Sequence, residues 1–266
     1  MKIGLSFITV GSAVDFDLQK TLRSINLLPS LADANLCFEH LIVVPSEPVA
    51  VVNLARKLLR TDLLHKVKIL KDEGKGIYQA MNIGLLSSEY QFKYFLNAGD
   101  ELYNSKLWEQ IFTVLGNTTY NKRSSSISFQ TYQRYANDLF LRGNKLRQLT
   151  DKSLIAHQGI IFNRKCFRQN QFDVTSNCYW SDYIFIKNNV KDIYPISQVG
   201  AIFNLGGVSN STDTKLSQRP KHKIIMHLIK IAISKFVSDG LYYRIIFFLK
   251  YKRVHARILK NSSLEE

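Results

Sequence analysis

Short apolar runs alternate with segments of helical periodicity through the first part of this sequence, and this alternation constrains the fold more than any other feature. Four apolar runs are strand candidates: residues 3–10, 40–45, 67–70 and 92–96. Three segments between them have the apolar spacing of helices: residues 17–28, 49–59 and 76–86. Strands that alternate with helices form βαβ units, so the sequence predicts an α/β fold with a mostly parallel sheet.

The run at residues 92–96 is followed at once by Asn97-Ala98-Gly99-Asp100. In open α/β sheets, ligands bind outside the carboxyl ends of the strands. An acidic turn that contains glycine at this place therefore predicts a site for a charged ligand or a metal ion.

The second half of the chain holds more scattered signals and no internal repeat. It contains three further strand candidates and one helix start: residues 126–132, 159–162 and 199–203, and residues 180–186. Residues 209–218 are polar and predict a linker, and Pro220 suits the first turn of a following helix.

Positive charge is concentrated at the C-terminal end. The whole chain of 266 residues has a net charge of +15. Residues 215–260 hold twelve Lys or Arg against one acid, Asp239, a local net charge of +11, which leaves +4 for the rest. The sequence therefore predicts two parts, a globular domain over residues 1–214 and a basic extension over residues 215–266.

The extension has the pattern of a basic amphipathic helix. Its apolar side chains recur at helical spacing: Ile224, Ile225, Leu228, Ile231, Ala232 and Phe236. Such helices can lie on an anionic membrane surface. The alternative is that the apolar face packs on the first domain while the lysines face water. So one-sided a charge exceeds what solubility requires, and we expect contact with the inner face of the cytoplasmic membrane.

Composition excludes several other classes of protein. With 45% hydrophobic residues the chain can bury a core, so disorder is excluded. Cys37, Cys166 and Cys178 are too far apart for a zinc site or a disulfide framework, which favours a reducing compartment. The first apolar run is too short for a secretory signal, and lysines and arginines interrupt every run that could cross a bilayer. We therefore expect a cytoplasmic protein.

Five motifs follow one another in the chain: KGIYQAMNIG (75–84), NAGD (97–100), HQGIIF (157–162), WSDYIF (180–185) and NLGGVSN (204–210). In order and spacing they resemble those of family 2 inverting glycosyltransferases from bacterial polysaccharide, capsule and lipopolysaccharide gene clusters. The resemblance covers roughly residues 3–210 and implies a Rossmann-like GT-A fold, a nucleotide-diphosphate sugar as donor, a divalent metal and a carboxylate base.

Asp100 is the expected metal ligand, because Mg²⁺ or Mn²⁺ held by one or two carboxylates can neutralise a leaving diphosphate. Its neighbour Glu101 points elsewhere if the chain stays extended there. The structural alternative for Asp100 is a turn aspartate with no ligand.

Asp182 is the expected catalytic base by the same resemblance, since an inverting transfer needs a group that takes the proton of the attacking hydroxyl. The alternative is a carboxylate that stabilises a helix N-terminus. Trp180 could offer an aromatic face to an acceptor sugar, or it could be a core residue.

The remaining candidates come from the same motifs. Lys75 lies beside a predicted helix N-terminus, where it suits a diphosphate. Tyr78 and Asn82 are one helical turn apart and can face one cleft, and with Asn97 they are expected at the donor. Met81 is expected in the core instead.

His157 and Gln158 are expected to line the acceptor or diphosphate side. A structural role for His157, with its ring hydrogen-bonded in the fold, is an equal alternative.

One segment departs from the family pattern. Where the family usually has an acidic loop that contacts the nucleoside, residues 40–49 read HLIVVPSEPV, without an aspartate. The candidates for this contact are Glu47 or backbone groups near Thr9 to Ser12.

Three functions remain open from the sequence. The first is a membrane-associated glycosyltransferase that extends a glycan or a lipid-linked acceptor, with a UDP-sugar as the first expected donor. The second is a nucleic-acid-binding protein, supported by the basic charge but by no binding motif. The third is an inactive scaffold of the same fold.

Overall fold

The computed structural model describes residues 2–11, 13–31, 36–45, 48–117, 125–135, 138–142, 156–174, 181–190 and 192–204. Two units are distinguished in the chain. One comprises Met1–Tyr132 and Gly143–Phe203, and the other Gln133–Arg142 and Asn204–Glu266. The basic extension, the predicted linker and two predicted site residues, Glu47 and Trp180, lie outside the described residues.

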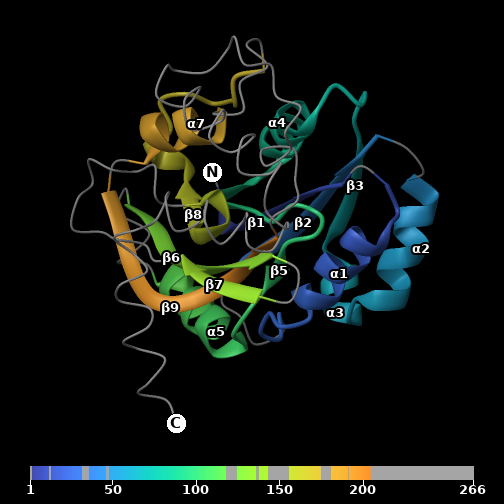
Figure 1. Cartoon of the computed structure of the whole chain (residues 1–266), viewed down its shortest axis with the longest axis horizontal. Coiled ribbons are helices and arrows are strands. Elements are labelled where there is room, and N and C mark those ends of the chain that lie inside the picture. The colour runs from blue at the N-terminus through green and yellow to red at the C-terminus, as the bar shows by residue number, and fades with distance from the viewer. Residues whose placement is uncertain are drawn as a thin grey trace, which may run out of the picture. The chain divides into compact units, whose positions relative to one another are not determined.

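Four parallel strands form the first half of the sheet. They are β1 (Lys2–Val10), β2 (Cys37–Val44), β3 (Val67–Lys71) and β4 (Tyr90–Phe95). Their order is β3-β2-β1-β4, and all three pairings are parallel (Figure 1). The α/β alternation in the sequence thus gives the parallel sheet that it predicts.

Beyond β4 the sheet becomes antiparallel. The further strands are β5 (Glu101–Leu102), β6 (Ser125–Tyr135), β7 (Asp138–Arg142), β8 (Ile160–Asn163) and β9 (Asp192–Asn204). The path continues β4-β8-β6-β9-β5, with β7 beside β6, and β8 runs antiparallel to both β4 and β6. The sheet is therefore mixed.

Helices cover both faces of the sheet (Figure 1). One face packs against α1 (Phe16–Ile25), α2 (Pro48–Leu58), α3 (Thr61–Leu64) and α5 (Ser105–Gly116). The other packs against α4 (Ile77–Ser87) and α7 (Ser181–Asn189). Within the described residues, no helix combines the length and apolarity needed to cross a bilayer.

Helix α1 forms for reasons that are visible in its sequence. Asp15 caps it, because its Oδ1 accepts a hydrogen bond from Leu18 N at 2.9 Å. Leu18, Leu22 and Ile25 are fully buried at helical spacing, and Thr21 is buried among them. Thr21, the polar residue of this apolar face, contacts the turn that follows β4.

Helix α4 lies directly on β1. Met81 is buried in the core, as its position in the motif predicts. Gly84 faces the strand so closely that a Cβ added there would lie 2.4 Å from Ile8 Cγ2. The glycine therefore permits the close approach of helix and strand.

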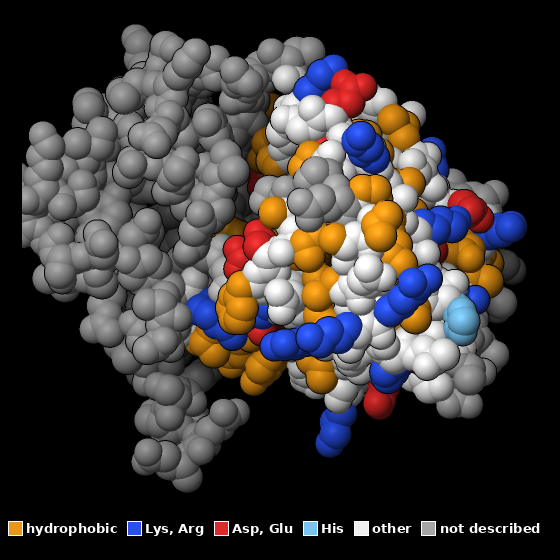
Figure 2. Space-filling view, turned by 90° about the vertical axis from the view of Figure 1, so that its right-hand side faces the viewer, with side chains coloured by type: hydrophobic (Ala, Val, Ile, Leu, Met, Phe, Trp, Pro, Cys, Tyr) orange, Lys and Arg blue, Asp and Glu red, His pale blue; other side chains and the backbone are white. Residues whose placement is uncertain are grey.

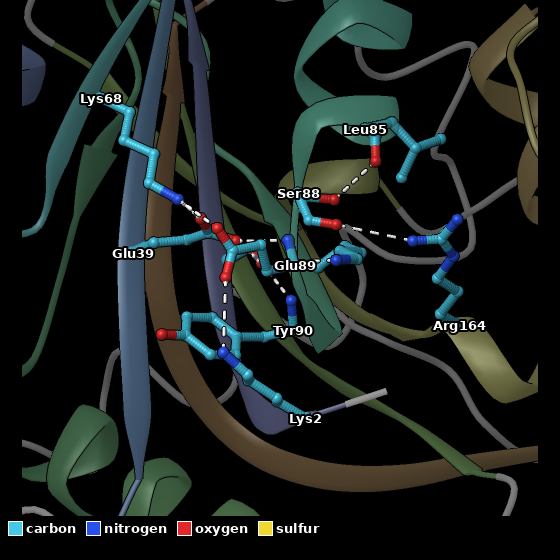
Figure 3. Close-up of polar contacts among 10 residues, drawn as sticks. Lys2, Glu39, Lys68, Leu85, Ser88, Glu89, Tyr90 and Arg164 are labelled. Atoms are coloured by element: carbon cyan, nitrogen blue, oxygen red, sulfur yellow. Dashed lines mark hydrogen bonds and ion pairs between the residues drawn. The ribbon is translucent and has the colours of Figure 1, made fainter.

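A polar cluster lies toward the amino ends of the parallel strands, with Glu39 buried and Lys68 and Glu89 half-exposed (Figure 3). Glu39 Oε1 accepts hydrogen bonds from Ser6 Oγ and from Glu89 N, both at 2.7 Å. Lys68 Nζ donates to Glu39 Oε2 at 3.1 Å and to Glu89 Oε1 at 2.5 Å. Lys93 is fully buried, and its Nζ donates to Ser6 Oγ at 3.4 Å. This cluster is remote from the carboxyl ends of the strands, where ligands bind in such sheets.

Candidate active site

The strand order reverses at β1, which pairs with β2 on one side and with β4 on the other. In open α/β sheets, this reversal opens a crevice at the carboxyl ends of the two central strands. Residues 97–100 follow β4 at this place, and Ala98 N donates to Val10 O of β1 at 2.8 Å. The acidic turn thus lies where the sequence predicts the ligand site.

Thr21 of α1 holds this turn in place. Its hydroxyl donates to Asp100 O at 2.6 Å and accepts from Gly99 N at 3.0 Å. Gly99 has φ of +96°, a backbone conformation that favours glycine. The sequence analysis did not identify Thr21. The signal that could have found it is a threonine on the apolar face of a helix.

Asp100 is almost fully buried, with 4% of its surface exposed. Its Oδ2 accepts a hydrogen bond from Gln158 Nε2 at 2.9 Å. Gln158 is itself fixed, because its backbone oxygen accepts from Tyr94 Oη at 2.9 Å. Burial, together with the nearby charge of Asp100, raises the pKa of Tyr94 well above its usual value, so this hydroxyl keeps its proton. Gln158 thus orients the Asp100 carboxylate, a role that sequence reasoning did not assign to it.

His157 connects the turn to α7. Its Nδ1 lies 3.5 Å from Asp182 Oδ2, and its Nε2 lies 3.3 Å from Asn97 Nδ2. The Asp182 side chain is 32% exposed, so its carboxylate is accessible from solvent. Through Asn97 and His157, the predicted base is linked to the same turn that carries the predicted metal ligand.

Asn97 has one buried atom without a partner. The residue is 8% exposed, and its Oδ1 has no hydrogen-bond partner in the part of the chain that the structure describes. The described residues contain no group of three or more His, Cys, Asp or Glu that could hold a metal ion. Mg²⁺, however, often takes only one or two carboxylates and completes its shell with water and phosphate oxygens. Asp100 and the free amide oxygen of Asn97 are oxygen ligands of the kind that suits this arrangement.

The other residues predicted from the KGIYQAMNIG motif make structural contacts. Lys75 is exposed and forms an ion pair with Glu73, which raises its pKa. Asn82 binds the backbone of Phe172, with Oδ1 accepting from the N at 2.7 Å and Nδ2 donating to the O at 2.9 Å. Tyr78 stacks on the same phenylalanine, with ring centroids 5.8 Å apart. Their expected contacts with a donor stay predictions.

Thr9 is fully buried within the sheet rather than exposed at its edge. Its Oγ1 lies 2.9 Å from His40 Nε2 on the neighbouring strand. Burial lowers the pKa of His40 to about 3, so the imidazole stays neutral. The donor contact expected near Thr9 therefore needs a group other than this hydroxyl, and Glu47, the other candidate, lies outside the described residues.

Direct contacts thus connect five of the predicted site residues. They are Asn97, Asp100, His157, Gln158 and Asp182, and Asp100 N, which donates to Asn97 O at 2.9 Å, joins the Gln158–Asp100 pair to the others. Glu101 begins β5, and its carboxylate pairs with Lys20 at 3.1 Å.

Comparison with solved structures assigns the fold. It is that of GT-A-like glycosyltransferases, a class of α/β protein that the mixed sheet and its site at the strand reversal fit. No protein-family model matches the sequence, and a search of the curated proteins found no match.

The individual structures are distant in sequence. S. aureus TarS (residues 1–349) in complex with UDP-GlcNAc has 16% identity and a TM-score of 0.61, over 91% of this chain and 70% of that fragment. The same fragment in complex with UDP has 13% identity and a TM-score of 0.60, over 97% and 75%. Mannosyltransferase PcManGT from Pyrobaculum calidifontis, in complex with GDP-Man and Mn²⁺, has 11% identity and a TM-score of 0.51, over 88% and 63%.

Proposed function

We propose that this protein is an inverting, metal-dependent glycosyltransferase. In this proposal it transfers a hexosyl group from a nucleotide-diphosphate sugar to a glycan or lipid-linked acceptor of the cell surface. One observation carries the proposal: Asp100 and Asp182, from motifs far apart in the chain, belong to one connected group at the strand reversal. The ligands of the similar structures, UDP-GlcNAc and GDP-Man with Mn²⁺, support a sugar nucleotide as donor.

The two carboxylates suit two different tasks. Asp100 is buried and oriented by Gln158, which suits a fixed metal ligand. Asp100, with the Asn97 amide oxygen as a second candidate ligand, would hold Mg²⁺ or Mn²⁺, which would supply positive charge to the leaving diphosphate.

Asp182 is partly exposed, which suits a group that must meet an acceptor. In the proposed reaction the acceptor oxygen attacks the anomeric carbon while the bond from that carbon to the diphosphate breaks. Asp182 takes the hydroxyl proton, and attack from the opposite face converts an α-linked donor into a β-linked product.

The proposed place of action is the inner face of the cytoplasmic membrane. It rests on the basic extension of the sequence, which could hold the enzyme beside a lipid-linked acceptor.

Binding of the donor is tested first. UDP-, GDP- and dTDP-sugars are screened for thermal stabilisation of the protein with and without Mn²⁺. A donor that binds the folded state raises the apparent melting temperature by mass action, and we expect the largest rise for a UDP-sugar with Mn²⁺. No rise with any sugar nucleotide would contradict the proposal and favour the inactive scaffold.

Catalysis is tested with substitutions of the two carboxylates. We expect Asp100→Ala to abolish metal-dependent donor turnover. We expect Asp182→Asn to bind donor like the parent but to lose about 10²- to 10⁴-fold in transfer, the usual contribution of a general base. Glu101→Gln is the matched control, since this neighbouring carboxylate pairs with Lys20. Equal transfer by Asp182→Asn and the parent would refute the assignment of the base.

A further inference from the structure

His157 lies between two groups that impose different demands on its ring. Asp182 Oδ2 is 3.5 Å from Nδ1, and Asn97 Nδ2 is 3.3 Å from Nε2. The histidine is 9% exposed and belongs to a 3₁₀ turn, η2 (His157–Gly159), in which Gly159 N donates to Ala156 O at 2.9 Å. The ring is thus held by a short, hydrogen-bonded segment.

These neighbours select one form of the neutral imidazole. An ionised Asp182 carboxylate can only accept a hydrogen bond, so the nitrogen that faces it must carry the proton. The Asn97 amide nitrogen can only donate, so the nitrogen that faces it must offer its lone pair. Both demands are met when Nδ1 is protonated and Nε2 is not.

We propose that His157 is a positioning residue for Asp182: its Nδ1–H donates to Oδ2 and orients the carboxylate, while Asn97 fixes the tautomer. This inference rests on the proposed function, in which Asp182 is the base. Nδ1 and Oδ2 are 3.5 Å apart, and catalytic hydrogen bonds commonly shorten when substrate binds.

The same contacts connect the base to the donor side of the site. Asn97 begins the turn that ends at Asp100, and Thr21 binds the backbone of both residues, at 3.3 Å and 2.6 Å. The ring that orients the base is therefore fixed to the turn that carries the proposed metal ligand. These contacts hold the proposed base and the proposed donor site at fixed positions relative to each other.

Replacing His157 by asparagine or by glutamine distinguishes a positioning role from a role in filling space. Asparagine can place its amide N–H close to the place of Nδ1, whereas glutamine places a polar group close to that of Nε2. We expect His157→Asn to keep transfer within about tenfold of the parent. We expect His157→Gln and His157→Ala to lose about 10²-fold in kcat, the scale of a misplaced catalytic group, with little change in the donor KM. Melting temperatures like that of the parent establish that each variant is folded.

Three outcomes would overturn the role of His157. The first is equal losses in the asparagine and glutamine variants, and the second is a loss expressed in the donor KM rather than in kcat. The third is full activity of His157→Ala. A parent protein that transfers no sugar from any donor would instead refute the proposed function, and the role of His157 in catalysis with it.

Nitrogen NMR of the histidine ring in the full-length parent gives a readout that needs no turnover. At pH 8 we expect a protonated Nδ1 and an unprotonated Nε2. In Asn97→Leu, which removes the donor to Nε2, we expect a mixture of tautomers. A proton on Nε2 in the parent, whether in the other tautomer or in an imidazolium, would overturn the inference.

Discussion

At the scale of the residue, the charged groups differ in how deeply they are buried, and each degree of burial suits a different role. Asp100 is 4% exposed and faces an amide donor, whereas the side chain of Asp182 is 32% exposed and faces an imidazole. A third charged group, Lys93, is fully buried, and its Nζ donates to Ser6 Oγ and to no carboxylate among the residues that the structure describes. The burial of Lys93 makes the stability of the protein depend on pH, independently of the candidate site.

The pKa of Lys93 falls to about 7, first because of burial and then because of the charge of Arg164, while Glu39 and Glu89 oppose the shift. An unfolded lysine keeps its proton up to a pKa of about 10.4. Between these two values, folding releases a proton, so the stability of the protein increases as pH rises above 7. Below pH 7 the buried ammonium opposes folding to its full extent.

We therefore expect Lys93→Met to raise the free energy of unfolding at pH 6. This advantage should shrink by about 1.4 kcal/mol for each pH unit between 7 and 9, because the parent gains stability there and the variant does not. Urea unfolding at pH 6, 7, 8 and 9 measures the difference. Lys106→Met, at an exposed position of α5, is the control and should show no such trend. A difference that stays constant with pH would show that Lys93 keeps its usual pKa.

At the scale of the element, α4 shows how a motif combines packing with function. The KGIYQAMNIG motif predicts a helix with residues directed at the donor. In the structure, Tyr78 and Asn82 of this helix bind Phe172, and Gly84 lies against Ile8 of β1. Much of the motif thus serves to seat the helix on the sheet and to hold the segment that precedes α7.

Gly84→Ala tests this seating. A methyl group at this position would lie 2.4 Å from Ile8 Cγ2 and 3.3 Å from Val43 Cγ2. Overpacking of a core commonly costs about 1–3 kcal/mol, which exceeds the gain of about 1 kcal/mol from the higher helix propensity of alanine. We expect a net loss of about 1 kcal/mol or more in the free energy of unfolding.

Urea denaturation measures this loss, and Leu86→Ala at an exposed position of the same helix serves as the control. Stabilisation by Gly84→Ala would show that propensity outweighs packing here and that the contact with β1 relaxes.

At the scale of the whole molecule, charge is unevenly divided along the chain. Figure 2 shows that on one face of the described part, Lys and Arg side chains are spread among hydrophobic and acidic ones rather than gathered in one patch. Residues 215–260 of the C-terminal extension, outside the described residues, hold +11 of the total +15. The proposed contact with an anionic membrane therefore rests on this extension.

Charge reversal in the full chain tests the membrane role. We expect Lys223→Glu/Lys230→Glu/Lys235→Glu to reduce binding to anionic vesicles by more than tenfold, because each basic residue near such a surface contributes about 1 kcal/mol. Removal of the residues after Ser217 should abolish binding without unfolding the first domain. Co-sedimentation with vesicles at low and high salt measures both effects.

The matched control carries the same number of reversals on the described unit, at the exposed residues Lys57, Lys71 and Lys106. Equal loss in both triple variants would indicate general electrostatics rather than a specific role of the extension. Unchanged sedimentation of the protein without the extension would contradict the membrane role.

Sequence patterns were sufficient to predict β1 to β4, the helices α1, α2 and α4, and the position of the acidic turn. Periodicity predicts β1 to β4 and the helices between them, because apolar spacing reports burial locally. The acidic turn after β4 follows from the rule for parallel sheets, and the ordered motifs indicated a GT-A-like fold, which the solved structures support.

Which side chains contact one another became evident from the folded chain alone. The pairing of Gln158 with Asp100, the link from Asn97 through His157 to Asp182, and the support of the turn by Thr21 all join residues at least 25 positions apart. The contact between Thr9 and His40 and the hydrogen bond from Phe172 N to Asn82 also join residues that are far apart in the chain. Periodicity describes one element at a time, whereas hydrogen-bond partners depend on the packing of several elements, so these contacts could not be predicted from the sequence.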